Sequence, residues 1–270
     1  MNVVHIENIE APGLAPYARL TERQLQSRLH PEEGVFICES MKVIRVALEH
    51  GMMPVSFLCE EKHLDSVRGS LEEGGIEVPV YTAPREVLCS LTGYELSRGV
   101  LCAMRRPSLP PVAEVLAGAR RVAVLDGVVN SENTGAIFRA AASLGMDAVL
   151  LTRTCCDPLN RRACRVSMGT VFQLPWTFLD SYRQLKECGF GIVALALTDH
   201  SVPIDNAELK CLDCMAIVMG TEGDGLGDAV LGLADHVARI PMQRGVDSLN
   251  VAAAAAVAFW ELGKPPAAQV

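Results

Sequence analysis

The sequence predicts an α/β protein whose C-terminal half contains a parallel sheet. Two observations support this prediction. Strand-like and helix-like patterns alternate along the 270 residues, which is the order found in α/β folds. In the second half, residues 191–197 and 215–219 are near-continuous apolar runs, as expected of parallel strands that are covered on both faces.

Residues 1–104 are expected to form a first unit, a small α/β sandwich. Ser40 precedes an amphipathic segment and is suited to an N-cap, and Gly74 and Gly75 mark the end of a later helix. The expected strands are residues 35–39, 55–58, 78–81 and 99–103, and the expected helices are residues 17–29, 41–49 and 62–73.

Residues 105–111 contain three prolines and two arginines, which is typical of a linker, although a loop inside one domain has the same composition. The second unit then covers residues 112–270. Its expected strands are residues 121–125, 148–151, 191–197, 215–219 and 236–240, and its expected helices are residues 133–144, 182–188 and 228–233, followed by an alanine-rich helix from about residue 251.

The composition limits the possible partners. The formal net charge of -8 argues against a protein that coats nucleic acid non-specifically, but it leaves room for a local basic site. No signal peptide is recognisable, and the longest apolar run, residues 251–260, is too short to span a bilayer. We therefore expect a cytoplasmic protein. The one metal-like spacing among ten cysteines, Cys211-x-x-Cys214, lacks a second pair, so we expect no metal.

Polar residues follow the expected strand 121–125. Asn133 can cap a helix, Gly135 lets another backbone approach closely, and Arg139 lies about one turn further on. Open α/β sheets bind ligands at the carboxyl ends of their strands. Arg139 is therefore a candidate site residue, and a charged residue on a solvated helix face is the alternative.

A glycine-rich loop follows the apolar run 215–219. It contains Gly220, Glu222, Asp224 and Gly225, and its spacing differs from the Gly-x-Gly-x-x-Gly pattern of dinucleotide loops. The two carboxylates would repel a pyrophosphate. A nicotinamide site is therefore disfavoured, and a loop with an exposed backbone remains.

The third stretch is residues 240–260. Pro241 ends a short strand, Gly245 marks a turn, and either Ser248 or Asn250 can cap the helix that follows. That helix is almost all alanine, so a neighbouring element must pack very close to it. It is either an ordinary core helix or one wall of a tight ligand site.

Taken together in this order, the three stretches resemble the signature motifs of the SpoU (TrmH) family, the S-adenosylmethionine-dependent RNA ribose 2′-O-methyltransferases. The first motif, Asn-x-Gly-x-x-x-Arg, matches Asn133, Gly135 and Arg139. The second, Gly-x-Glu-x-x-Gly, matches Gly220, Glu222 and Gly225. The third, Ile-Pro-Met followed by Ser-Leu-Asn-Val, matches Ile240, Pro241, Met242, Ser248, Leu249, Asn250 and Val251. Ala252 departs from the family, where many members have Ser.

The resemblance implies a fold and a cofactor. The C-terminal part would be a SPOUT domain with a parallel sheet and a deep trefoil knot, which ordinary topology rules would exclude. The protein would be a homodimer through this knotted domain. S-adenosylmethionine would be bound by Leu197, Thr198, Gly220, Ile240, Met242, Ser248 and Leu249.

The resemblance also implies catalytic roles. Arg139 would bind the phosphate next to the reacting ribose and stabilise developing oxyanion charge, because a guanidinium stays protonated in ordinary protein sites. Asn133 would orient Arg139 or the ribose, and Glu222 would pair with the guanidinium. Ser248 and Asn250 would complete the polar shell.

The RNA partner, expected to be rRNA, would meet a local basic site. The first unit resembles the ribosomal-protein-like domain that precedes the catalytic domain in many rRNA-modifying members. An exposed charged helix is the alternative for part of this set. The RNA-binding candidates are Arg23, Arg28, Arg161, Arg162, Arg165 and Ser167. A tRNA methyltransferase and a non-catalytic RNA-binding protein on the same scaffold remain alternatives.

Overall fold

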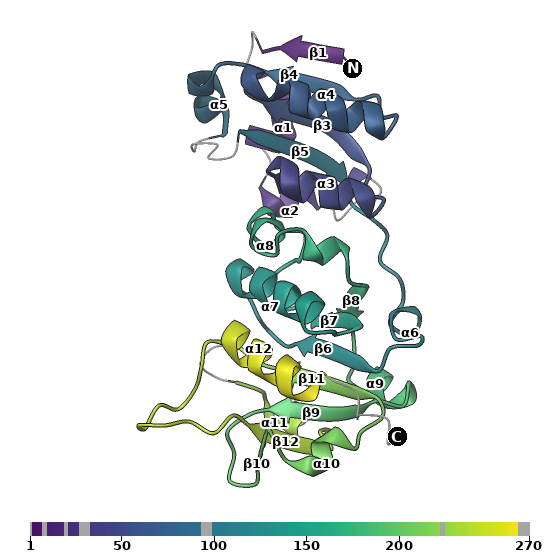
Figure 1. Cartoon of the computed structure of the whole chain (residues 1–270), viewed down its shortest axis with the longest axis vertical. Coiled ribbons are helices and arrows are strands. Elements are labelled where there is room, and N and C mark those ends of the chain that lie inside the picture. The colour runs from purple at the N-terminus through teal and green to yellow at the C-terminus, as the bar shows by residue number, and fades with distance from the viewer. Residues whose placement is uncertain are drawn as a thin grey trace. The chain divides into compact units, whose positions relative to one another are not determined.

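The chain folds into two compact units, of which the second carries the predicted motifs (Figure 1). The computed structural model describes residues 2–6, 10–18, 21–26, 33–92, 99–221 and 225–263. The first unit comprises Met1–Ser108 and Leu159–Phe172, and the second comprises Leu109–Pro158 and Gln173–Val270. The segment Leu159–Phe172 thus belongs to the first unit, although the sequence pattern predicts it in the second.

The first unit is built on a mixed five-stranded sheet. In spatial order its strands are β1 (Asn2–His5), β4 (Pro79–Thr82), β3 (Pro54–Cys59), β5 (Val100–Arg105) and β2 (Val35–Glu39). β1, β4 and β3 run parallel, and β5 is antiparallel to both of its neighbours. Side chains alternate between the faces of a strand, so each buried strand supplies both faces of the sheet with apolar residues.

Helices cover both faces of this sheet (Figure 1). One face carries α3 (Met41–Glu49) and α4 (Leu64–Glu73), preceded by the short 3-10 helix η3 (Glu61–His63). The other carries the 3-10 helix η1 (Pro12–Leu14) with α1 (Ala15–Ala18), α2 (Glu22–Leu25) and α5 (Arg85–Thr92). As predicted, Ser40 caps α3, its hydroxyl accepting from the Val43 N–H.

The single helix expected over residues 17–29 is wrong, because two short helices, α1 and α2, occupy its described part. Thr21 starts α2 with a capping box: its hydroxyl accepts from the Gln24 N–H, and the Gln24 side chain accepts from the Thr21 N–H. The Thr-x-x-Gln pattern is a helix-start signal that lies inside the apolar period. Capping therefore prevails over periodicity here.

The segment Leu159–Phe172 contains α8 (Arg161–Val166) and the 3-10 helix η4 (Thr170–Phe172). It packs on β2, where the rings of Phe172 and Phe36 are 5.8 Å apart. The Arg165 guanidinium forms an ion pair of 3.1 Å with Glu39, which is almost fully buried. These contacts explain why a segment from the middle of the chain completes the first unit.

The second unit contains a seven-stranded sheet in which every pairing is parallel. In spatial order its strands are β10 (Val202–Pro203), β12 (His236–Arg239), β9 (Gly191–Leu195), β11 (Met215–Met219), β6 (Arg121–Leu125), β7 (Ala148–Thr152) and β8 (Trp176–Leu179). β6 and β11 are buried along their whole length. The predicted α/β fold with a parallel sheet is confirmed.

Two layers of helices cover this sheet. The short helices α6 (Val112–Val115), α9 (Arg183–Glu187) and α11 (Asp228–Leu231) bury their apolar side chains in one core cluster. The longer helices α7 (Ser131–Ser143) and α12 (Val251–Leu262) pack against each other, and α10 (Ala207–Lys210) is tied to α12 by an ion pair between Lys210 and Glu261.

The expected linker over residues 105–111 is only partly free of regular structure. Arg105 is the last residue of β5, and the Arg106 N–H donates to the Gly34 carbonyl. Pro111 precedes the first turn of α6 as its N-cap. Within the described residues, no helix is both long and apolar enough to cross a bilayer.

Candidate functional site

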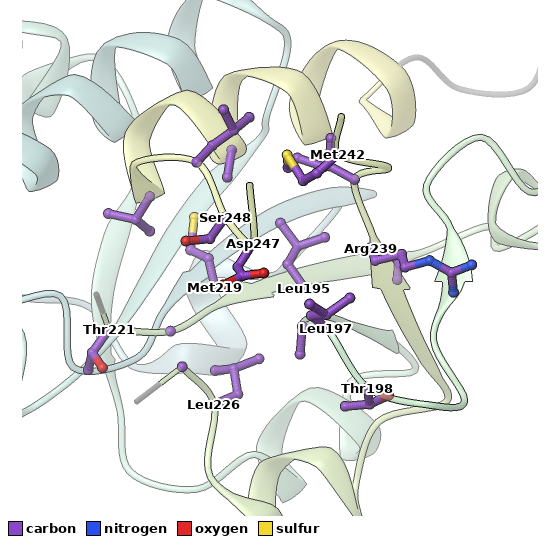
Figure 2. Close-up of a pocket in the computed structure, with 18 of the residues that line it drawn as sticks. Leu195, Leu197, Thr198, Met219, Thr221, Leu226, Arg239, Met242, Asp247 and Ser248 are labelled. Atoms are coloured by element: carbon purple, nitrogen blue, oxygen red, sulfur yellow. The ribbon is translucent and has the colours of Figure 1, made fainter. Parts of the chain in front are cut away.

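A cavity of about 670 Å³ opens at the carboxyl ends of three neighbouring strands in the second unit. Residues directly after β9, β11 and β12 form its walls, and the segment leading into α12 closes it. Parallel α/β sheets bind ligands at this edge, and the volume is within the range of small-molecule sites. Figure 2 shows Asp247 and Ser248 beside Met219 and Leu195, with Thr221 at one end and Arg239 at the other.

The structure brings the predicted cofactor-binding residues together at this cavity. All seven line it, although they come from three separate stretches of the sequence, and Asn250 lines it too. These residues are Leu197, Thr198, Gly220, Ile240, Met242, Ser248 and Leu249. Leu197 is 67% exposed, so a large apolar side chain faces open space on the cavity wall.

The backbone approaches itself very closely at Gly220. A Cβ atom on Gly220 would lie 2.5 Å from the Gly225 carbonyl oxygen and 2.9 Å from the Leu226 nitrogen. Real Cβ atoms do not reach such distances, so only glycine fits here. This cavity wall is therefore backbone, which can offer N–H and C=O groups directly to a ligand.

Asn250 connects the first and third predicted motifs. Its side-chain oxygen caps α12 by accepting from the Ala252 and Ala253 N–H groups, at 3.0 and 3.4 Å. Its amide nitrogen donates to Asn133 Oδ1 at 3.1 Å. Of the two predicted caps, Ser248 and Asn250, the structure selects Asn250.

Asn133 does not cap α7, contrary to the prediction. Asn130 is the N-cap, and its side chain accepts from the Glu132 and Asn133 N–H groups. Asn133 lies in the first turn, nearly buried, and its side chain accepts the hydrogen bond from Asn250. β6 ends at Leu125 as predicted, and α7 starts at Ser131, two residues before the expected helix start at Asn133.

Arg139 is exposed on α7 and is not among the residues that line the cavity. It makes no hydrogen bond or ion pair within the part of the chain that the structure describes. Glu222, its predicted partner, lies outside the described residues, and so does Asp224. The pairing of Arg139 with Glu222 stays a prediction.

Several cavity residues were not predicted from the sequence. Thr221 and Met219 flank the predicted Gly220, and Arg239 and Asp247 directly precede the predicted Ile240 and Ser248. Adjacency was their only signal in the sequence. Leu195 ends β9 and could have been found from the rule that strand ends bind ligands.

The loop after β6 is held against the second motif. Gly127 adopts a positive φ of 66°, and a Cβ there would lie 2.6 Å from the Thr221 methyl group. The Thr152 hydroxyl accepts from the Gly127 N–H and donates to Asp126. Burial raises the pKa of the neighbouring Cys155 thiol, so this group is a neutral packing partner at neutral pH.

The predicted RNA-binding residues differ in exposure and in their contacts. Arg23 is exposed on α2, and Arg162 is exposed on α8 in the same unit. The backbone N–H of Arg161 donates to Glu22, so α8 begins beside α2. Arg28 lies outside the described residues.

Arg165 and Ser167 make contacts within the first unit. The Arg165 guanidinium is paired with the buried Glu39. Ser167 is fully buried, and its hydroxyl donates to the Cys164 carbonyl and accepts from the Gly169 N–H. Because its side chain is fully buried, Ser167 cannot contact RNA in this structure, which corrects that expectation.

Metal ligands do not cluster in the described ranges, where no group of three His, Cys, Asp or Glu side chains could hold an ion. The Sγ atoms of Cys211 and Cys214 contact different backbone carbonyls, those of Ala207 and Ala119.

Comparison with known proteins shows the family of this chain. Residues 120–260 match the profile of the SpoU rRNA Methylase family. An uncharacterized tRNA/rRNA methyltransferase of Mycobacterium bovis is 37% identical over 97% of this chain and 92% of its own length. The chain belongs to the SpoU rRNA methylase family. A SpoU relative from Bacillus subtilis, a 23S rRNA (guanosine(2553)-2′-O)-methyltransferase, is 30% identical over 77% of this chain and 88% of its own.

Solved structures share the SpoU fold along nearly the whole chain. The crystal structure of an AdoMet-bound rRNA methyltransferase from Sinorhizobium meliloti superposes with a TM-score of 0.81, covering 96% of this chain and 97% of that one at 23% identity. The similarity in fold thus includes residues of both units.

Proposed function

We propose that the protein transfers a methyl group from S-adenosylmethionine to a ribose 2′-hydroxyl of RNA, with rRNA as the substrate. The observation that carries this proposal is the cavity at the ends of β9, β11 and β12, lined by residues of the second and third family motifs. The Asn250–Asn133 hydrogen bond joins the first motif to that cavity.

The residues present fit S-adenosylmethionine. The cavity combines apolar side chains such as Leu197 and Met242 with the bare backbone at Gly220, which suits a flat adenine ring read by backbone groups. Asp247 adds a negative charge that matches the positive sulfonium and ammonium groups. When bound, the cofactor would supply an electrophilic methyl group. Leu197, Thr198, Gly220, Ile240, Met242, Ser248 and Leu249 would hold it.

The protein's own residues would place the ribose and manage charge. Arg139 is an exposed cation on the helix that also carries Asn133. Its guanidinium would bind the phosphate beside the reacting ribose and stabilise negative charge on the 2′-oxygen as the proton leaves. Since the guanidinium stays protonated, a phosphate oxygen or water accepts that proton. Glu222 would pair with Arg139, and Ser248 and Asn250 would complete the polar shell.

The first unit would bind the RNA. Arg23 and Arg162 are exposed, and α2 and α8 are neighbours within this unit. Two such cations supply phosphate contacts that position an RNA without reading its sequence. Arg161 and Arg28 would extend this surface. The Bacillus subtilis relative acts on 23S rRNA by its name, which favours rRNA over tRNA.

A homodimer through the second unit is part of this proposal. Val257 and Trp260 on α12 are 39% and 59% exposed, and with the exposed Ala253 they follow the i, i+4, i+7 spacing of one helix face. Burial of such a stripe against a second copy would remove it from water. The deep knot would place α12 at this interface. RNA and cofactor both occur in the cytoplasm, where we place the reaction.

The test compares RNA from cells with and without this gene. Mapping of 2′-O-methyl groups in total RNA should show one rRNA position that loses its methyl group in the deletion strain and regains it on complementation. A lost tRNA methyl group would replace rRNA by tRNA as the substrate. Unchanged RNA, together with no calorimetric signal for S-adenosylmethionine, would refute the enzyme and favour a binding protein.

A further inference from the structure

Ser201, in the loop after β9, lies outside the family motifs and outside the lining of the cavity, yet it is one of the few buried polar residues of the second unit. We propose that Ser201 is a positioning residue for the cofactor site, because its hydroxyl fixes the wall formed by Leu197 and Thr198 and ties it to Arg239. This inference rests on the proposed function of the cavity.

The hydroxyl of Ser201 uses its full hydrogen-bonding capacity. It donates to the Thr198 carbonyl at 2.7 Å, and it accepts from the Thr198 N–H and from Arg239 Nη1, both at 3.3 Å. A serine hydroxyl has one donor and two acceptor positions. With all three occupied inside the protein, Ser201 has nothing left to offer a ligand.

These bonds join two walls of the cavity. Thr198 lines the wall that follows β9, and Arg239 ends β12, directly before Ile240. Ser201 is 5% exposed, although Asp199 and His200 before it are exposed. A buried serine with three hydrogen bonds inside an exposed loop is expected where a turn must keep one conformation.

The neighbouring Leu197 explains why this shape matters. Leu197 is 67% exposed, and exposure of an apolar side chain to water is unfavourable. A mobile loop would therefore tend to bury Leu197 against the protein. Holding it open in advance reduces the ordering cost of binding. Loss of these hydrogen bonds should therefore weaken cofactor binding and leave the rate at saturating cofactor unchanged, because Ser201 touches no reacting atom.

The test compares Ser201→Ala with Ser181→Ala. Ser181 is also a loop serine whose hydroxyl accepts a backbone N–H, that of Arg183, but it is exposed. Calorimetric titration with S-adenosylmethionine should give a Kd about tenfold higher for Ser201→Ala, or about 1.4 kcal/mol, and an unchanged Kd for Ser181→Ala. The KM for the cofactor should rise in parallel while kcat stays unchanged. The thermal midpoint should fall because three internal hydrogen bonds are lost, but the variant should remain folded at the assay temperature.

Three results would overturn the inference: a Kd within twofold of the parent, a fall in kcat at saturating cofactor, or a fraction of unfolded protein at the assay temperature large enough to account for the weaker binding. If Ser201→Ala does not fold, Ser201→Cys preserves the volume but bonds weakly and should show the same rise in Kd. A parent protein that does not bind the cofactor would instead refute the proposed function, so the two failures are distinguishable.

Discussion

Asn250 performs two tasks that mutation can separate. Its side-chain oxygen caps α12, and its amide nitrogen donates to Asn133. Asn250→Ala removes both interactions. Asn250→Ser keeps a good N-cap residue, but its hydroxyl is too short to reach Asn133. We expect the two variants to differ in stability and to share a loss of methyl transfer.

The magnitudes follow from the contacts. Removal of an N-cap costs about 1 kcal/mol, and a hydrogen bond of ordinary length contributes about 1 kcal/mol. Asn250→Ala should therefore destabilise the first turn of α12 by about 2 kcal/mol, and Asn250→Ser by about 1 kcal/mol. In amide exchange these values correspond to factors of about 30 and about 5.

The assay is hydrogen exchange at the Ala254 N–H, which donates to the Asn250 carbonyl at 2.9 Å, combined with methyl-transfer rates. Asn206→Ala is the matched control, because Asn206 caps α10 in the same way but lies away from the cavity. It should keep full activity. If Asn250→Ser were fully active, the link to Asn133 would have no functional importance. Equal exchange in Asn250→Ala and the parent would refute the cap argument.

Three further variants test other parts of the site. Arg139→Ala should abolish methylation with cofactor affinity largely intact; an equal loss of both, measured by calorimetry and rate, would contradict its role at the ribose. Asp247→Asn should raise the Kd of S-adenosylmethionine by about fivefold. The Kd of S-adenosylhomocysteine, which lacks the sulfonium charge, should rise less; equal increases would exclude charge recognition by Asp247. Ala255→Leu adds volume at a fully buried position. It should lower the free energy of unfolding in urea by about 1–3 kcal/mol or abolish the proposed dimer in sedimentation; a stable, active variant with the oligomeric state of the parent would show that the close packing is absent.

The sequence predicts five of the seven strands that the structure describes in the second unit, because continuous apolar runs such as β6 and β11 are typical of a sheet covered on both faces. It misses β8 and the two-residue β10. It also identifies the cavity residues that lie in motifs. Where several polar residues stand in a row, as from Asn130 to Asn133, the pattern cannot select the cap. β6 ends where predicted, so the choice depends on the path of the loop between Leu125 and α7, which is a tertiary property.

The membership of Leu159–Phe172 in the first unit also depends on tertiary contacts, so local sequence patterns cannot predict it. Its arginines are typical of an exposed basic helix, and only the structure shows that Glu39, more than a hundred residues earlier, is buried beneath Arg165. A buried carboxylate needs a partner. Neither residue of this pair reveals that need by its own neighbours in the sequence.

The alanine helix α12 runs from the carboxyl ends of the strands, where Asn250 lines the cavity, to their amino ends. At its far end the buried Arg121, the first residue of β6, donates from Nε to the Leu262 carbonyl at 3.0 Å and from Nη1 to the Asp213 carbonyl at 2.7 Å. Burial lowers the pKa of Arg121, yet a cation at a helix C-terminus is well placed. Twelve helical residues span about 18 Å, and the five residues of β6 span about 17 Å.

Because α12 and β6 have matching lengths, the anchoring of α12 at Arg121 also determines the position of Asn250 at the carboxyl ends of the strands. A one-residue deletion would rotate the helix start by about 100° and shift it by about 1.5 Å. The cap would then lose either its helix or its bond to Asn133. The small side chains of α12 let it lie close to α7. Because both ends of α12 are anchored, its position along α7 is defined, and so is the position of Asn250 at the cavity.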